Sequence, residues 1–475
     1  MARAKLSYLS DDDREFVHRE TVRVLEEVGV AYNTPQAVDI LAAAGAPVDR
    51  ESLTAKLPWA LVEECLAKVP RDILLAARDP ERDVCLDDDA LVTTSDGTAT
   101  YLMDDRSGER LEGSAEGLAK VMRLFDALPG IDYLWPSLSA RDLDPVTANL
   151  EIQVISLRNS VKHIQDEVRT PEFVDPLVDI LEAVAGDSLW QRPVFSIIHC
   201  TVAPLQHDRH MTEASIGMVR AGAPVLVLPM ALMGTTGPMS TLSTTIVNMA
   251  ELLSSVVLFE LAAPGCQIVS GIGSAAADMR TGFYLCGAPE AVLVNIIGVE
   301  MSRHYGLRAL ASCGTADAKQ VNYQAGFEAA LTGVPCALAG AEVLLYFGLL
   351  DGATIVSPAK TVLDSDAMGA IRRLVRENPV DASTALFDDI RDVGIGGHFL
   401  GAKSTRAFSR AGELWQPQLF QRQPFEAYAD RPLLDEAIER SEHLMATHEV
   451  APLGDDVEAH VAEVIRRHAA AARGA

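Results

Sequence analysis

Short apolar runs alternate with longer amphipathic stretches from about residue 112 to residue 400. The short runs predict buried β-strands at residues 133–138, 161–164, 194–201, 225–229, 267–271, 310–313 and 354–356. The longer stretches predict helices at residues 115–127, 171–185, 210–221, 242–261, 289–305 and 323–339. Because strand and helix alternate so many times, the pattern predicts an α/β fold with a parallel sheet and favours a closed (β/α)8 TIM barrel over an open, doubly wound sheet.

Additions flank this predicted barrel on both sides. Helical patterns occupy residues 10–28, 34–45 and 58–66, and residues 83–103 alternate like a β-hairpin packed on those helices. Further helices are predicted at residues 383–393, 404–411, 431–449 and 456–473. The sequence therefore predicts an N-terminal helical and hairpin subdomain (1–111), a TIM-barrel domain (112–400) and a C-terminal helical extension (401–475).

Composition narrows the class of protein. Hydrophobic residues make up 48% of the 475 residues, and the formal net charge is −27. Such an acidic chain is a poor partner for nucleic acid or for an anionic membrane surface. The seven cysteines are widely spaced and form no C-x-x-C, which argues against a disulfide framework and a structural zinc site. The apolar runs are broken by charged residues, and the first residues lack an apolar signal segment, so we expect a cytoplasmic protein.

The sequence at residues 271–287, GIGSAAADMRTGFYLCG, is the strongest candidate for a substrate loop. It follows a predicted strand and precedes the helix that opens at Pro289. Loops after the carboxyl ends of barrel strands carry the active sites of TIM-barrel enzymes. A surface connection is the alternative interpretation, since many glycine-rich loops have no other role.

The ends of the other predicted strands supply further candidates. Aromatic candidates are Tyr133, Trp135, Phe283, Tyr346 and Phe347, and polar candidates are His163, His199, Arg280, Lys319 and His398. Gly234, Gly237 and Asp278 are candidates for shaping loops. Each has a structural alternative: the aromatics could pack in the core, His199 could be a hydrogen-bonded core histidine, and the charged residues could pair within their loops.

Several familiar chemistries are absent from the sequence. The sequence contains no G-x-S-x-G nucleophile elbow and no P-loop, and no G-x-G-x-x-G motif opens the first strand–helix unit. His199 and Cys200 form an isolated pair without further zinc ligands. What remains is a barrel mouth with aromatic, small and a few polar residues. Aromatic faces attract quaternary ammonium groups, and the acidic chain favours a cationic ligand.

Motifs throughout the chain carry a family resemblance. They are RVLEEVGV (23–30), RDPERDV (78–84), LPMALMGTTGPMS (228–240), ADMRTG (277–282), GAPEAVLVN (287–295), DAKQVNYQAGFE (317–328) and GGHFLG (396–401). With these motifs the chain resembles the trimethylamine methyltransferase (MttB-like) family. The resemblance implies a TIM barrel that moves a methyl group from a methylated amine to cobalt(I) of a corrinoid (cobalamin) carried by a separate corrinoid-binding protein.

The founding members of that family use pyrrolysine, whereas this chain contains only standard residues. It therefore looks like the non-pyrrolysine branch, whose members demethylate quaternary amines, and glycine betaine is the substrate that we expect. Other methylated donors (proline betaine, carnitine, choline, a sulfonium compound) and a non-catalytic ligand-binding relative stay open. We expect residues that position the substrate rather than a catalytic acid or base, no bound metal or cofactor in this chain, and a homo-oligomer.

The chain departs from the family pattern at three places. Residues 234–237 read GTTG where relatives often have an alanine-rich loop, a glutamate that relatives often carry near Ala359 is missing, and His199 is not part of the family pattern. These positions are candidates for setting substrate choice.

Overall fold

Eight parallel strands form a closed barrel in the computed structural model, which describes residues 4–88, 90–97, 99–427 and 431–474. The barrel strands are β6 (Val92–Ser95), the segment at residues 133–135, β9 (Ile164–Asp166), β10 (Phe195–Val202), β12 (Val225–Leu228), β13 (Ile268–Ile272), β16 (Arg308–Ser312) and β17 (Val343–Phe347). Single bridges from Thr94 to Tyr133 and from Leu134 to Ile164 join the second strand to its neighbours, and β17 pairs with β6. The TIM-barrel prediction is confirmed.

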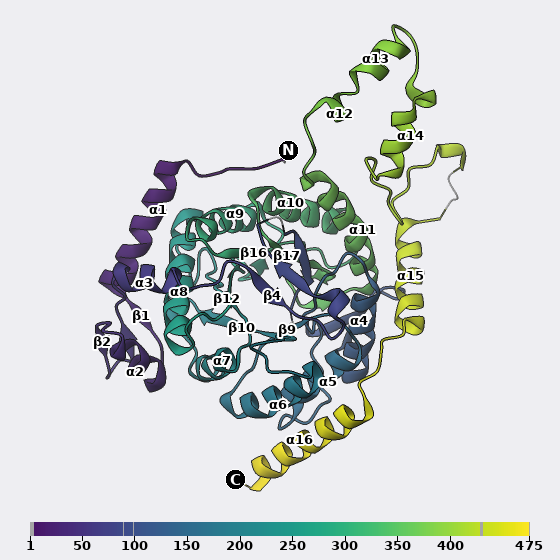
Figure 1. Cartoon of the computed structure of the whole chain (residues 1–475). Helices are drawn as coiled ribbons and strands as arrows, with labels where there is room; N and C mark the ends of the chain where they lie inside the picture. Colours follow the sequence, from purple (N-terminus) through teal and green to yellow (C-terminus); the bar gives the residue numbers. More distant parts are fainter. Residues whose placement is uncertain (1–3, 89, 98, 428–430, 475) are drawn as a thin grey trace.

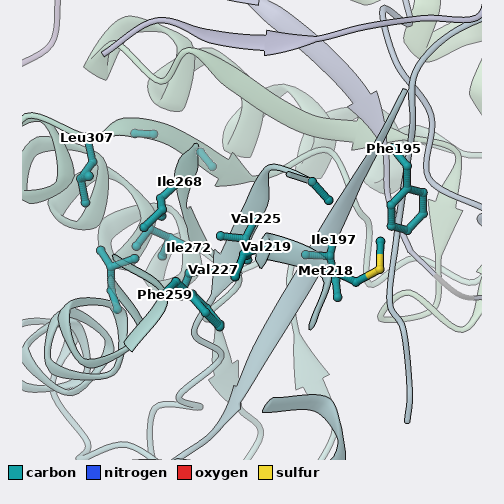
Figure 2. Packing of buried hydrophobic residues seen from close by; sticks show 14 of the residues in the cluster. Phe195, Ile197, Met218, Val219, Val225, Val227, Phe259, Ile268, Ile272 and Leu307 are labelled. Atoms are coloured by element: carbon teal, nitrogen blue, oxygen red, sulfur yellow. The ribbon is translucent and has the colours of Figure 1, made fainter. Parts of the chain in front are cut away.

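A ring of helices covers the outside of the barrel (Figure 1). They are α4 (Ala115–Ala127), α5 (Ala148–Arg158), α6 (Val174–Ala185), α7 (Arg209–Ala221), α8 (Thr241–Ala262), α9 (Pro289–His304), α10 (Tyr323–Ala339) and α11 (Pro358–Val375). Outward-facing apolar side chains of the strands meet these helices. Figure 2 shows Val225 and Val227 of β12 and Ile268 and Ile272 of β13 in this layer, near Phe259 of α8.

Helix α8 is long and apolar enough to cross a membrane, but it lies inside the protein. The most apolar stretch of 18 residues in this helix is 78% buried, and the helix packs against α9, α3 and α1. Burial on nearly all sides explains the hydrophobic composition, because a helix enclosed by neighbours has no polar face to present to water.

The N-terminal residues form a helical unit beside α8 (Figure 1). It contains α1 (Asp11–Arg23), a π-helical turn (Val24–Val28), α2 (Pro35–Ala43) and α3 (Trp59–Leu66), with the short strands β1 (Val30–Ala31), β2 (Val48–Asp49) and β3 (Thr54–Ala55). Strand β1 joins the barrel sheet through β11 (Gln206–His207), which pairs with the end of β10. Helix α1 begins where predicted, because Ser10 and Asp13 form a capping box.

The segment predicted as one hairpin at residues 83–103 divides among three places. Strand β5 (Val84–Leu86) pairs with β4 (Ile73–Leu75), β6 enters the barrel, and β7 (Tyr101–Asp104) pairs with β8 (Glu109–Glu112). The barrel therefore begins before the predicted boundary at residue 112. The predicted strand at residues 354–356 is also not a barrel strand, since β19 (Ile355–Val356) pairs with β7 and β18 (Leu349–Leu350).

The β4–β5 hairpin fills the amino-terminal end of the barrel, and β4 lies at its centre in Figure 1. Ile73, Leu75 and Leu86 are fully buried and pack with interior residues of seven barrel strands. Polar contacts fix the hairpin: Gln267 accepts a hydrogen bond from the Leu74 N–H at 2.7 Å, and the Ala76 N–H donates to the Pro193 carbonyl at 3.0 Å. This end of the barrel is closed, so a ligand can reach the interior from the opposite end only.

Buried Arg308, at the start of β16, holds the chain on either side of the hairpin. Its Nε donates to the Arg71 carbonyl at 2.6 Å, and its guanidinium forms ion pairs with Asp88 at 2.7 Å and Asp72 at 3.3 Å. The hydrogen bond from Arg308, together with its positive charge, holds the pKa of Asp88 below its usual range. One arginine thus ties both flanks of the hairpin to a barrel strand.

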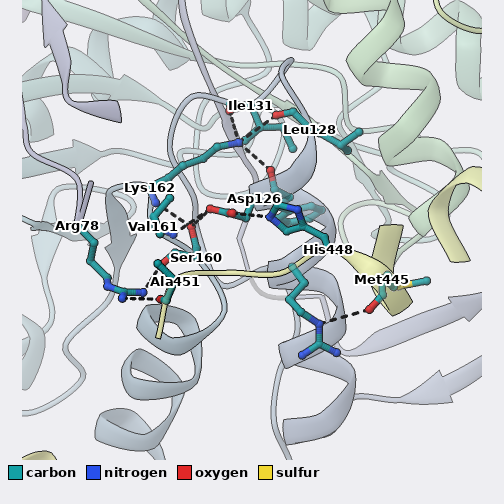
Figure 3. A network of polar contacts seen from close by, with 12 residues as sticks. Arg78, Asp126, Leu128, Ile131, Ser160, Val161, Lys162, Met445, His448 and Ala451 are labelled. Carbon is teal, nitrogen blue, oxygen red and sulfur yellow. Dashed lines mark hydrogen bonds and ion pairs between the residues drawn. The ribbon is translucent and has the colours of Figure 1, made fainter. Parts of the chain in front are cut away.

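The C-terminal residues return to the barrel wall. They form α12 (Ala382–Ala385), α13 (Phe387–Val393), α14 (Lys403–Arg410), α15 (Leu433–Thr447) and α16 (Asp455–Gly474), close to the predicted helices. Between α15 and α16, His448 binds the Asp126 carboxylate at 2.7 Å, and Arg78 donates to the Ala451 carbonyl at 2.8 Å (Figure 3). Burial favours a raised pKa at Asp126, but the hydrogen bonds from His448, Ser160 and Val161 outweigh it and lower that pKa.

Replacing Leu75 by alanine should destabilise the protein by about 2–5 kcal/mol, because the side chain is fully buried in the hairpin and the barrel interior cannot collapse onto the space. Urea unfolding measured by circular dichroism gives this free energy. The control is Leu111→Ala, at a half-exposed position of β8, which should change stability by less than about 0.5 kcal/mol. Equal effects of the two changes would show that the hairpin does not close the barrel.

Candidate functional site

Four residues stand at the carboxyl ends of barrel strands, in the rows of side chains that face the interior: Asp96, Trp135, Glu167 and Cys200, called here the mouth cluster. Side chains alternate between the two faces of a strand. Val92 and Tyr133 pack in the interior, so Asp96 and Trp135 continue the inward rows of their strands. Glu167 follows the inward Gln165, and Cys200 follows the inward Ile198. The four residues come from four neighbouring barrel strands.

The indole of Trp135 is held rigidly at the mouth. Its N–H donates to the Asp166 carboxylate at 3.2 Å, and its backbone N–H donates to Ser95 Oγ at 2.8 Å. Gly97 lies against the ring, where a Cβ would stand only 2.6 Å from two ring carbons. A side chain at position 97 would therefore displace the indole, and glycine at this position preserves its place.

Two carboxyl groups beside Trp135 are hard to ionise. Burial, together with the neighbouring charge of Glu167, raises the pKa of Asp166 to about 7, although Gln153 donates a hydrogen bond to it. Burial raises the pKa of Asp96 to about 6, although Thr315 donates to it at 2.8 Å. Within the described residues neither carboxylate has a cation at ion-pair distance, and buried Lys360 pairs with Asp364 instead, at 2.7 Å.

Glu167 and Cys200 lie side by side over the interior. The Cys200 thiol donates to the Glu167 carboxylate at 3.6 Å, and burial together with that carboxylate raises the pKa of the thiol well above its usual value. Cys200 is therefore a neutral thiol at physiological pH and a weak nucleophile. The mouth cluster thus combines one aromatic face with acidic groups and contains no activated nucleophile.

The loop at residues 271–287 folds over this cluster as a small hairpin of β14 (Ala276–Ala277) and β15 (Tyr284–Leu285). Asp278 closes its turn by accepting the N–H groups of Arg280 at 2.7 Å and Thr281 at 3.2 Å. The Tyr284 hydroxyl donates to the Gly273 carbonyl at 2.9 Å, and nearby Asp96 helps to keep the pKa of Tyr284 high, after burial itself. Tyr284 therefore adds a second aromatic ring near Asp96.

The loop after β12 supports this hairpin. The backbone N–H of Met233 donates to the Ala275 carbonyl, and the Met233 carbonyl accepts from the Ala277 N–H, both at 3.0 Å. These bonds make a short strand pairing between the two loops. Gly234 adopts φ +96°, a conformation that favours glycine, and Gly237 leaves no space for a Cβ, which would stand 2.9 Å from Thr244 Oγ1. The two glycines let the loop turn tightly beneath the hairpin.

The rim above the cluster carries cations and methionines. Lys319 lies 3.9 Å from the centre of the Phe283 ring and forms an ion pair with Asp351 at 2.7 Å. One face of Phe283 is thus occupied by Lys319. Arg280 is exposed on the hairpin turn. Met239 and Met279 are 59% and 64% exposed and flank Gly234, so the rim is apolar beside these cations.

Two of the predicted site residues lie deeper in the barrel than the mouth. Tyr133 is buried one layer below Trp135, with its hydroxyl 3.5 Å from Gln165. His163 binds the Ala76 carbonyl at 2.9 Å and Ser196 at 2.8 Å, and burial lowers its pKa to about 4. His163 is a neutral imidazole that fixes the closing hairpin.

Four others point away from the mouth. His199 faces outward from β10, between Ser215 at 3.0 Å and His207 at 2.9 Å, and burial lowers its pKa to about 3. Tyr346 lines a hollow outside the barrel between α10 and α11, and Phe347 is buried in the same outer layer. His398 is exposed between α13 and α14, on a segment that leaves the barrel (Figure 1). Of the predicted aromatics, only Trp135 and Phe283 lie at the mouth.

Sequence reasoning missed Asp96, Asp166, Glu167 and Tyr284, and it named Cys200 only beside His199, as part of an incomplete zinc set. The pattern assigns Asp96 to the predicted hairpin at residues 83–103, because it does not identify β6 as a barrel strand. Asp166 and Glu167 directly follow the predicted strand at residues 161–164, so their position at a strand end was the available signal. Among the residues that the structure describes, no group of three or more histidine, cysteine, aspartate or glutamate side chains is arranged to hold a metal ion.

Comparison with known proteins places this chain in a family. The sequence model of trimethylamine methyltransferase matches residues 2–472. The chain is 28% identical over 407 residues to a trimethylamine methyltransferase of Desulfitobacterium hafniense, covering 85% of this chain and 82% of that protein. It is 27% identical over 480 residues to that of Methanosarcina barkeri (99% and 97%), and 26% identical over 461 residues to a glycine betaine methyltransferase of D. hafniense (96% and 95%).

Among solved structures, the monomethylamine methyltransferase of M. barkeri aligns with a TM-score of 0.54 at 12% identity, over 99% of this chain and 88% of that chain. That likeness supports the fold. Because the family model covers nearly the whole chain, the protein belongs to the trimethylamine methyltransferase family and is a methyltransferase that takes its methyl group from a methylated amine.

Proposed function

We propose that this enzyme moves a methyl group from a quaternary amine, with glycine betaine as the favoured substrate, to the reduced corrinoid of a separate protein. One observation carries the proposal: the mouth cluster sets an aromatic face beside carboxylates that have no cationic partner in the described residues. A quaternary ammonium supplies the missing cation and needs no hydrogen bond, so aromatic and acidic groups suffice to bind it. The glycine betaine methyltransferase among the relatives supports this substrate class.

The ammonium group would lie against Trp135, between Asp96 and Glu167. In a buried site a cation stabilises the ionised form of nearby carboxyl groups, so binding would lower the pKa of Asp96 and of Asp166 behind the indole. The cations Arg280 and Lys319 on the rim suit a carboxylate at the other end of the ligand. A zwitterion such as glycine betaine satisfies both ends.

The substrate itself makes an acid catalyst unnecessary. When the methyl group is transferred, the C–N bond breaks and its electron pair stays on nitrogen, which leaves as a neutral tertiary amine without accepting a proton. The reduced cobalt of the corrinoid supplies the nucleophile that accepts the methyl group. The side chains of this chain hold the C–N bond in one orientation and exclude water. Loss of the positive charge removes the attraction to Trp135 and Asp96, which favours product release.

The rim supports a protein partner as the methyl acceptor. Exposed methionines are adaptable and polarizable, and they are common on protein-binding surfaces. Met230, at 40% exposure, adds to Met239 and Met279 on the loops around the mouth. A corrinoid protein that docks on this rim would bring its cobalt to the open end of the barrel, since the other end is closed.

The first test is a substrate panel. The enzyme is mixed with cob(I)alamin or its reduced corrinoid protein, and the loss of the cobalt(I) absorbance is followed with glycine betaine, carnitine, choline, trimethylamine and dimethylsulfoniopropionate. Glycine betaine should be demethylated fastest, and its product should be dimethylglycine. Faster turnover of choline or the sulfonium compound would identify that compound, and not glycine betaine, as the favoured methyl donor. Ligand binding without methylation of any corrinoid would favour a non-catalytic binding protein.

Changing Asp96 to asparagine should weaken glycine betaine binding by about tenfold at pH 8, because it removes one buried charge next to the cation. In the wild type, affinity should rise between pH 5 and pH 8, since Asp96 (pKa about 6) and Asp166 (pKa about 7) become ionised across that range. Isothermal titration calorimetry measures both effects.

The matched control is Asp12→Asn, at an exposed carboxylate of α1, which should leave the affinity and its pH dependence unchanged. Circular dichroism confirms that each variant is folded. If Asp96→Asn binds glycine betaine like the wild type at every pH, the mouth cluster is not the cation site.

A further inference from the structure

The segment from residue 379 to residue 414, called here the arm, leaves the barrel wall after α11 and returns before α15. It carries α12, α13 and α14, and Figure 1 shows it projecting away from the barrel. No residue of the arm is buried. A segment without its own core, standing clear of the barrel, is not stabilised by apolar burial within this chain.

The arm exposes large apolar side chains to an unusual extent. Ile395 is fully exposed, Leu400 is 85% exposed and Phe387 is 69% exposed. Val380 is 78% exposed, and Ile390, Phe399 and Leu414 are 45–60% exposed. Single exposed apolar residues are common on protein surfaces, but a concentration of them on one projecting segment indicates an interaction surface.

The base of the arm is fixed, so its tip is presented in a defined place. Glu413 forms ion pairs with Arg373 and Arg376 of the α11 end, both at 2.8 Å. In the segment that returns to the barrel wall, the backbone N–H groups of Gln418, Leu419 and Phe420 donate to the carboxylate of Asp366 on α11 at 2.8–3.0 Å. Such a base distinguishes the arm from a loose tail and reduces the entropy that binding would cost.

A hollow of about 410 Å³ lies next to this base, between α10 and α11. Its lining is mostly apolar, with Leu363, Phe420, Leu433 and Leu434 among the side chains, and it includes the Lys360–Asp364 ion pair. Beside it on α10, Tyr323 and Phe327 stack with ring centres 6.3 Å apart and are 88% and 53% exposed. The hollow and the arm are therefore two apolar features on one side of the same chain.

Charge distinguishes the distal half of the arm, residues 393–412, from the rest of the molecule. Residues 393–412 contain Lys403, Arg406 and Arg410 and no aspartate or glutamate, whereas the whole chain has 67 acidic and 40 basic residues. Asp435 and Glu436 lie in the first turn of α15, directly after the leucines that line the hollow. Residues 393–412 are apolar and basic, whereas residues 379–392 and Glu413 add five acidic residues and one arginine to the arm. The distal half of the arm therefore complements the acidic turn beside the hollow.

We propose that the arm binds a second copy of this chain and inserts its apolar side chains into the hollow between α10 and α11 of that copy. A two-fold interface uses the same patch on both subunits, so the patch must contain both complementary halves. Phe420 belongs to the returning base of the arm and also lines the hollow, so the halves are continuous. The arm is longer than the about 20–30 residues that each partner contributes to a standard interface.

The test is the mass of the full-length protein in solution, measured by light scattering after size-exclusion chromatography. The wild type should be an oligomer of at least twice the 51.0 kDa chain mass. The double change Ile395→Asp with Leu400→Asp should reduce it to a monomer, because it places charges on fully or mostly exposed positions of the arm. Val28→Asp, a matched change at a 64% exposed position of the N-terminal unit, should leave the mass unchanged.

A second variant tests the hollow. A Cβ at Gly326 meets no atom within 4 Å, so Gly326→Trp can fill the hollow from its edge without disturbing the chain, and it should also give a monomer. Circular dichroism shows whether each variant is folded. A monomeric wild type, an oligomer that keeps its mass in the arm variant, or association of the arm with the corrinoid protein alone would overturn the proposal. Dissociation by the arm change but not by Gly326→Trp would overturn the assignment of the hollow.

Discussion

Closure of the barrel by the β4–β5 hairpin is the constraint on which the rest of the structure depends. Three fully buried side chains of the hairpin complete the interior core, and Arg308 fixes its two flanks to β16. Because the amino-terminal end is filled, a ligand enters at the carboxyl end, where we propose that the partner also docks. This explains why aromatic, acidic and exposed apolar groups are concentrated there, while His163, beneath them, serves the hairpin as a neutral imidazole.

The buried carboxyl group of Asp166, behind the indole of the mouth cluster, is costly to ionise in the absence of a ligand. A rise in the pKa of Asp166 from 3.8 to about 7 corresponds to ~4 kcal/mol that the folded state must supply to keep the carboxylate ionised. A cation held against Trp135 recovers part of that free energy. On the proposed function, the site needs neither a strong nucleophile nor an acid: its carboxylates would provide an electric field for a substrate that already contains its leaving group.

The alternation of strands and helices was sufficient to predict the barrel, and the helical patterns at residues 10–28 and 34–45 were sufficient to predict α1 and α2. The interior of the site was harder to predict. Recognition of β6 failed because a four-residue strand beside turn residues resembles a hairpin, and without it Asp96 had no place in the barrel. His199 and Tyr346 were misplaced for another reason: a strand end shows which residues are near the mouth, but the inward or outward direction depends on register, which the strand-end positions do not specify.

The central claim is that a quaternary ammonium binds beside buried carboxyl groups whose pKa values burial has raised. Its most direct test is proton release on binding. Calorimetric titration of glycine betaine at pH 6.5, in buffers with different enthalpies of ionisation, measures the protons released per ligand bound. The account predicts a clear net release, because the bound cation lowers the pKa of Asp96 and Asp166 and drives them to ionise. Binding with no change in protonation would contradict it.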